Sequence, residues 1–229
     1  MHFISFRKYV KKRNMRNLLG IIFGLLFSFS AFAQNDAEYR KVLTERAEKI
    51  VKTLGINDSE KYNRVTETLV NQYKTLGEIN DGYDNNIKIV KEKTKDRSQL
   101  EAATASLYNE KMAQLYDAQC AFLGNLSADL TDEQINQVKD GMTYGVLMVT
   151  YKSYNDMVPT LKENEKRQIY AWLIEAREHA MSASSSKDKH GWFGKYKGRI
   201  NNYLSKQGYD IQKERKAWEE RVKAAGGTL

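Results

Sequence analysis

Side chains that could serve as catalysts or metal ligands are few in this sequence. Beyond residue 33, histidine occurs only at positions 179 and 190, and Glu175 lies one helical turn before His179. That spacing can place two ligands on one face of a helix, but neither HExxH nor the ExxH pattern of helical di-iron sites completes the set. No G-x-S-x-G, glycine-rich phosphate loop or Cys/His nucleophile pair occurs either. We therefore predict no catalytic residue, no metal site and no cofactor; a polysaccharide-active hydrolase or lyase that uses Glu175, His179 or His190 is the weakest alternative.

The segment most informative about binding is residues 189–210, KHGWFGKYKGRINNYLSKQGYD. On a helix, at about 100° per residue, its side chains divide into three faces. An apolar face holds Phe193, Tyr196, Ile200, Tyr203 and Leu204, a face of small residues holds Gly194, Gly198, Asn201 and Ser205, and a polar face holds Lys195, Arg199 and Asn202.

The small-residue face requires an explanation, because each glycine inside a helix costs about 1 kcal/mol relative to alanine. One interpretation is a neighbouring helix packed closely against the glycines, with Asn201 bonding across the seam. The other is a ligand groove with a floor of small residues, in which aromatic rings stack on sugar rings and Lys195 and Arg199 favour an acidic sugar. On the second interpretation, the ligand-binding residues are Trp192, Lys195, Tyr196, Arg199, Asn201, Asn202 and Tyr209.

The elements that must position this segment follow a helical period. Apolar residues recur at i, i+3, i+4 and i+7 over residues 39–54, 62–76, 100–122 and 169–180, and two more helices are expected near 192–206 and 210–224. Capping boxes at Asn57/Glu60 and Thr131/Gln134 predict two helix starts, and Gly55 predicts a helix end. We expect turns or loops at residues 80–86, 124–129 and 182–186, and a charged segment at 88–97 that is either mobile or weakly helical. Residues 146–150 are β-branched but have no partner strand, so we interpret them as buried helix, and the sequence predicts an all-α, single helical domain of six to eight helices.

Residues 1–33 have the order of a cleaved signal peptide, and residues 34–229 form the predicted helical domain. Six basic residues precede an apolar run over residues 18–29, and Ala31-Phe32-Ala33 gives an A-x-A cleavage site after Ala33. Translation from Met15 instead of Met1 would leave the same apolar run. We therefore expect a periplasmic or secreted protein with no membrane span after cleavage.

Removal of this leader changes the charge of the chain. The formal net charge of +8 includes the six leader cations, so 31 of the 37 basic residues remain against 29 acidic residues, a net of +2. This near balance argues against nucleic acid as a partner. Cys120 is the single cysteine, so no internal disulfide can form, and its neighbours indicate a small core residue, with a reactive thiol as the alternative.

Several motifs also resemble a known family. AREHAM at residues 176–181, FGKYKGRINNYL at 193–204 and GYD at 208–210 are similar to an uncharacterised family of exported, all-helical Bacteroidetes proteins, a domain of unknown function that is provisionally described as sugar-binding. The resemblance covers most of the chain after residue 33. It implies a setting beside glycan-degradation proteins, with an acidic oligosaccharide as the candidate ligand, and it supplies no proven ligand or catalytic residue.

A fainter similarity concerns LTDEQ at residues 130–134, which matches the LTxxQ signature of small periplasmic chaperones. The function hypothesis from the sequence is a non-catalytic, glycan-associated periplasmic protein. An LTxxQ-like chaperone, which would shield unfolded clients on an apolar concavity, is the first alternative.

Overall fold

A computed structural model describes residues 36–227 of the chain. Within that range the backbone forms α-helices and no strand, which confirms the all-α prediction. A first helix over residues 36–51 continues into a 3-10 turn, η1 Lys52–Leu54. With this first helix, the described residues form eight α-helices. The other seven are α2 Ser59–Lys93, α3 Arg97–Ser127, α4 Asp132–Met142, α5 Val146–Met157, α6 Glu163–Met181, α7 Ser186–Lys206 and α8 Ile211–Ala224. None of the described helices is long and apolar enough to cross a bilayer.

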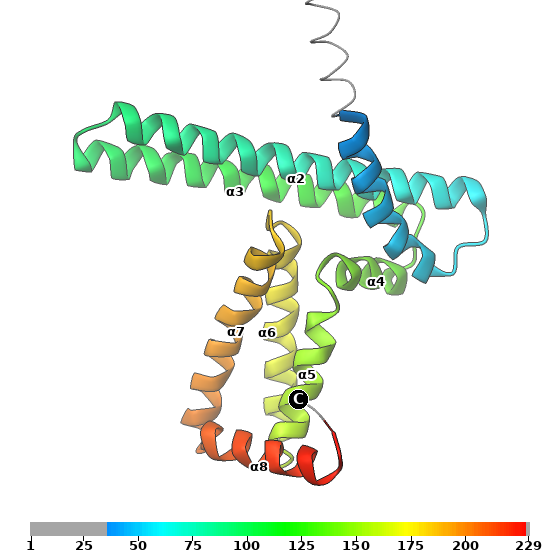
Figure 1. Cartoon of the computed structure of the whole chain (residues 1–229), viewed down its shortest axis with the longest axis vertical. Coiled ribbons are helices and arrows are strands. Elements are labelled where there is room, and N and C mark those ends of the chain that lie inside the picture. The colour runs from blue at the N-terminus through cyan, green and yellow to red at the C-terminus, as the bar shows by residue number, and fades with distance from the viewer. Residues whose placement is uncertain (1–35, 228–229) are drawn as a thin grey trace, which may run out of the picture. The chain divides into compact units, whose positions relative to one another are not determined.

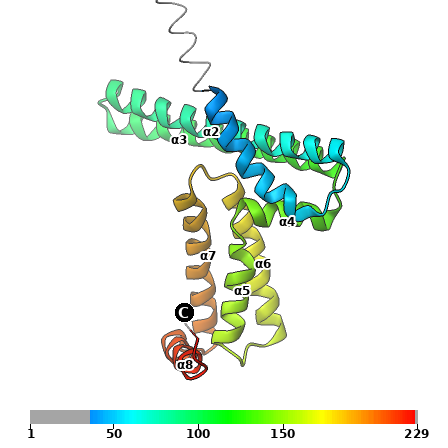
Figure 2. The same ribbon diagram turned by 45° about the vertical axis from the view of Figure 1, so that its right-hand side comes forward.

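Helices α2 and α3 pack side by side as a long hairpin (Figures 1 and 2). Each begins at an aspartate that accepts a hydrogen bond from the backbone, Asp58 from Lys61 and Asp96 from Gln99. The predicted cap at Asn57 was therefore wrong by one residue. The predicted turn at 80–86 was wrong too, because α2 continues to Lys93. The segment at 88–97, expected to be mobile or weakly helical, is regular helix up to Lys93, and only residues 94–96 separate α2 from α3.

The polar residues that suggested a turn are accommodated inside α2. Asn80 is buried, and its amide donates to the carbonyl oxygen of Leu76 at 2.7 Å. Such a bond one helical turn back satisfies the side chain without ending the helix. The expected loop at 124–129 is likewise mostly helix, since α3 runs to Ser127 and buries Leu126.

Other helix ends lie where the sequence placed them. Gly55 adopts a left-handed backbone with φ of 67°, and the Thr131/Gln134 capping box is complete. The amide of Gln134 also donates to the carbonyl of Leu54 at 2.8 Å, which ties the start of α4 to the end of η1. Residues 146–150 are helical, as predicted, but only one face is buried, since Val149 is exposed.

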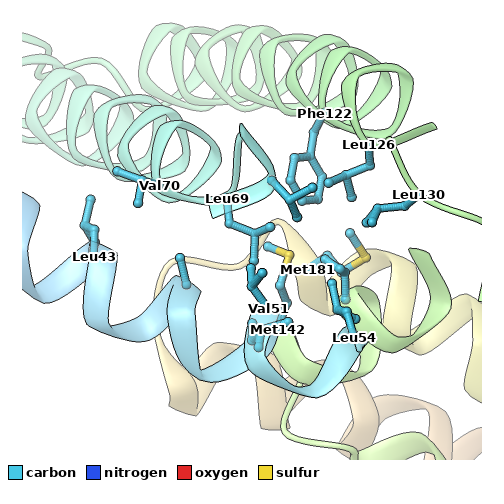
Figure 3. Close-up of a cluster of buried hydrophobic side chains, with 14 of the residues drawn as sticks. Leu43, Val51, Leu54, Leu69, Val70, Phe122, Leu126, Leu130, Met142 and Met181 are labelled. Carbon is cyan, nitrogen blue, oxygen red and sulfur yellow. The ribbon is translucent and has the colours of Figure 1, made fainter. Parts of the chain in front are cut away.

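Two apolar clusters hold the helices together. In the first, side chains from residues 43–54, α2, α3 and α4 surround Met181 at the end of α6 (Figure 3). The second is formed by α5, α6 and α7, with Ile169, Leu173, Phe193 and Ile200 at its centre, and Trp218 of α8 packs against it. Cys120 belongs to neither cluster and is exposed, so its interpretation as a core residue was wrong.

Candidate ligand-binding cleft

Helix α7 carries the segment that the sequence singled out. Its cap is Ser185, whose hydroxyl accepts from the backbone of Asp188. The predicted apolar face is confirmed: Phe193, Ile200 and Leu204 are fully buried against α5 and α6. The polar face and, apart from Asn201, the small-residue face therefore turn away from the core.

The small-residue face is open at its two glycines, whereas Asn201 of the same face bonds Tyr154 of α5. A Cβ atom added to Gly194 or Gly198 would meet no heavy atom of another element within 4 Å, and both residues are exposed. The interpretation of these two glycines as a packed helix seam was therefore wrong. The close approach occurs instead at Gly141 of α4, where an added Cβ would lie 2.9 Å from two side-chain carbons of Ile50.

One end of the α7 polar face lines a cleft of about 740 Å³. Helices α2, α3, α6 and α7 and the loop between α6 and α7 contribute to its walls. Its aromatic residues are Tyr108, Tyr116, His179 and Trp192, its cations are Lys111, Lys187 and Lys195, and its uncharged polar residues include Asn80, Gln119, Ser182 and Ser184. Such a combination of apolar rings with a few polar groups is typical of small-molecule sites.

The rings in this cleft are accessible or held in fixed stacks. Tyr116 is 69% exposed and Tyr108 is 48% exposed. The Trp192 indole stacks on the imidazole of His179, with centroids 4.4 Å apart and an angle of 13° between the ring planes. The ammonium of Lys195 lies 4.9 Å from the Trp192 ring centroid. These contacts fix the orientation of Trp192 while two tyrosine rings remain free to stack on a ligand.

The charges of the cleft favour an anion. Both carboxylates in its lining already have partners: Glu178 accepts from Lys139 and Arg177, and Asp188 accepts from the hydroxyls of Ser184 and Ser185. The hydrogen bond from Ser185 is the main reason that the pKa of Asp188 lies below its usual value. Within residues 36–227, no carboxylate lies within 4.0 Å of the ammonium groups of the three lining lysines, Lys111, Lys187 and Lys195.

A buried network positions the α6 wall of the cleft. The guanidinium of Arg177 donates to Asp140 and to Asn136 of α4, both at 2.8 Å, and also bonds the adjacent Glu178. Gln119 of α3 donates to Glu178 at 3.2 Å. Helices α3, α4 and α6 are thus joined at the carboxylate that faces the cleft, which fixes the position of His179 beside it.

A second, shallower hollow of about 540 Å³ lies further along α7. It is lined by Trp172 of α6 and, on α7, by Lys195, Gly198, Arg199, Asn202, Tyr203 and Lys206. The Arg199 guanidinium lies 4.5 Å from the Trp172 ring centroid and bonds Glu175 at 3.1 Å. Both members of this ion pair are about half exposed, so the pair is weak and can exchange partners.

The seven sequence-predicted residues are divided among different surroundings. Trp192 and Lys195 line the cleft, and Lys195, Arg199 and Asn202 line the second hollow. Tyr196 is buried beneath Arg199.

The last two, Asn201 and Tyr209, are engaged with the protein. Asn201 accepts from the hydroxyl of Tyr154 at 2.7 Å, and the Tyr209 hydroxyl donates to Glu165 at 2.8 Å. Burial raises the pKa of Tyr154 to about 12, so this phenol keeps its proton, and remains the donor, even in alkaline solution. These two residues line neither hollow.

Sequence reasoning missed the contribution of α3. Tyr108, Met112 and Tyr116 are spaced four residues apart and line the cleft together. That spacing places them on one face of a helix. Two tyrosines on a face that also carries Gln119 were the available signal, but nothing local to α3 says that Trp192 lies opposite. Within the described residues, no group of three or more His, Cys, Asp or Glu side chains converges to hold a metal ion.

Comparison with known proteins gives a family but no activity. A family profile with the description "Protein of unknown function (DUF3826)" matches residues 40–224. The chain belongs to this family. No curated protein matches the chain. The DUF3826 region contains every helix that lines the cleft and the second hollow.

Proposed function

We propose that this DUF3826 protein is an exported, non-catalytic binding protein for an acidic oligosaccharide, which it holds in the cleft beside Trp192. The observation that carries the proposal is the convergence of accessible aromatic rings with three lysines whose ammonium groups have no carboxylate within 4.0 Å in the part of the chain that the structure describes. Ring faces stack on the C–H faces of sugars, and the ammonium groups provide charge-assisted hydrogen bonds to carboxylates.

The arrangement supports binding more than catalysis. Glu175 is paired with Arg199, His179 is stacked on Trp192, and His190 is stacked with Tyr144 at 5.8 Å. Of these three candidate catalytic groups, only His179 lines the cleft. A hydrolase would require an acid and a base placed on either side of one bond.

The chaperone alternative rests on residues 130–134, and these have local structural roles. Thr131 and Gln134 cap α4, Gln134 bonds Leu54, and Leu130 is buried in the first apolar cluster. The motif therefore contributes to helix termination and packing, and it lines neither hollow.

Calorimetric titration with oligogalacturonates tests the proposal. The double variant Tyr116→Ala, Lys195→Ala removes one free ring and one unpaired ammonium from the cleft. Loss of one stacking contact and one charge-assisted bond together corresponds to about 2 kcal/mol, or about a thirty-fold higher Kd.

The matched control is Tyr170→Ala, Lys197→Ala. Tyr170 is an exposed tyrosine on α6, Lys197 is an exposed lysine on α7, and neither lines the cleft. The control should bind like the wild type. Equal affinity of the two double variants, or suppression of client aggregation by a wild type that binds no oligogalacturonate, would reject the proposal.

A further inference from the structure

The cleft and the second hollow share one residue, Lys195, and are lined by one continuous face of α7. Six residues of this face follow one another at intervals of three or four residues: Lys187, Gly191, Lys195, Gly198, Asn202 and Lys206. These intervals bring residues to the same side of a helix. At 1.5 Å per residue, the face from Lys187 to Lys206 is about 28 Å long, which is much more than one sugar ring occupies.

Helix α6 contributes to the other wall of both hollows. Trp172 borders the second hollow and His179 and Ser182 border the cleft, with Glu175 between them in the sequence. The Glu175–Arg199 ion pair joins α6 and α7 at the second hollow, which Arg199 lines. Gly191 and Gly198 have no side chain, so the backbone of α7 itself lines the hollows at these two positions.

We infer that the ligand is an extended acidic oligosaccharide that occupies both hollows, runs along α7 past Lys195 and takes the place of Glu175 beside Arg199. The inference rests on the proposed function and specifies the length and charge of the ligand. The cleft holds one end of the chain against Trp192. The second hollow holds further units against Trp172, where Arg199 and Lys206 neutralise their carboxylates.

The row of charges and rings agrees with such a ligand. Lys187, Lys195 and Lys206 are exposed, and none has a carboxylate within 4.0 Å among the described residues. Each hollow has its own tryptophan with a cation over the ring, Lys195 over Trp192 and Arg199 over Trp172. A ligand that reaches both hollows gains the second set of contacts without a second loss of translational freedom.

The test compares a galacturonate disaccharide with a galacturonate octasaccharide by calorimetry on the full mature chain. The octasaccharide should bind at least about ten-fold more tightly, because only it reaches the second hollow. Lys206→Ala and Trp172→Ala should each weaken octasaccharide binding about three- to ten-fold and leave disaccharide binding unchanged. Lys197→Ala, a charge loss on the same helix outside both hollows, should change neither.

Each failure has a separate meaning. Equal affinity for the two lengths, or an unchanged octasaccharide affinity in both Lys206→Ala and Trp172→Ala, overturns the extended site and leaves the cleft proposal standing. If neither the disaccharide nor the octasaccharide binds, the proposed function itself is rejected. Poly-glutamate that binds as tightly as the octasaccharide, or a fully methyl-esterified octasaccharide that does so, overturns the specificity for an acidic sugar. Lys206 is a surface residue, so its variant remains informative if Trp172→Ala fails to fold.

Discussion

Alanine substitution of glycines on two helices should change stability in opposite directions. Gly194 and Gly198 lie in α7 with open space where a Cβ would be, so alanine adds helix propensity without a clash. Each substitution should raise the free energy of unfolding by about 0.5–1 kcal/mol, and the double variant by about 1–2 kcal/mol. The gain comes mainly from the unfolded chain, which has fewer conformations to lose.

Gly141 in α4 should behave in the reverse way. An added Cβ would lie 2.9 Å from Cγ1 and Cγ2 of Ile50 and 3.2 Å from its Cδ1, whereas carbon atoms at optimal separation are about 3.5–4.0 Å apart. Ile50 is 7% exposed and Val138 of the same cluster is fully buried, so the surroundings have little room to yield. Overpacking of this kind costs about 1–3 kcal/mol, which exceeds the propensity gain, so Gly141→Ala should be destabilising by about 1–2 kcal/mol.

Urea unfolding followed by far-ultraviolet circular dichroism measures these changes as shifts in the midpoint at constant slope. Truncation of Ile50 to alanine removes the three clashing carbons, so Gly141→Ala should cost less in the Ile50→Ala background than in the wild type. A double-mutant cycle gives this coupling directly. If Gly141→Ala stabilises the protein as much as Gly194→Ala, or if the coupling with Ile50 is zero, the close approach of α4 to residue 50 is incorrect.

Two further predictions concern buried charges. Lys189 is 7% exposed, donates to the carbonyls of Ala180 and Met181, and has its pKa lowered by burial from 10.5 to about 8. In the unfolded chain the Lys189 ammonium therefore keeps its proton to a higher pH than in the folded protein. The free energy of unfolding should then rise by about 1 kcal/mol between pH 7 and pH 9. Urea titrations should show that rise in the wild type and not in Lys189→Met, and a parallel pH profile for both would contradict the assignment. Asp140→Ala leaves the buried Arg177 without its 2.8 Å carboxylate partner and should cost about 2–3 kcal/mol. Glu175→Ala, which breaks the half-exposed pair with Arg199, should cost less than about 1 kcal/mol in the same assay, and similar losses in the two variants would refute the distinction.

The signal peptide predicted at residues 1–33 and its cleavage after Ala33 lie outside the described residues. The export of the proposed binding protein therefore remains a prediction. Mass spectrometry of the secreted or periplasmic product would give its N-terminal residue directly.

Local sequence patterns determined much of the secondary structure. The apolar face of α7, the Thr131/Gln134 cap and the helical end at Gly55 all depend on residues within one or two turns of each other. Such interactions are formed by the chain wherever the helix lies, so periodicity and capping chemistry suffice to predict them. The turn expected at residues 80–86 was wrong because packing of α3 along α2 outweighs the weak helix propensity of those residues.

The candidate site depended on tertiary structure. The sequence identified Trp192, Lys195 and Arg199 on one helix, but only the fold brings Tyr116 of α3 to the same cleft as Trp192. The hydrogen bond from Tyr154 that engages Asn201 likewise depends on how α5 packs against α7. The sequence alone also could not say which glycines are covered, since Gly198 is open and Gly141 lies against Ile50. Contacts between residues far apart in the chain are set by how whole helices pack, and a short pattern contains no information about the element that will lie opposite it.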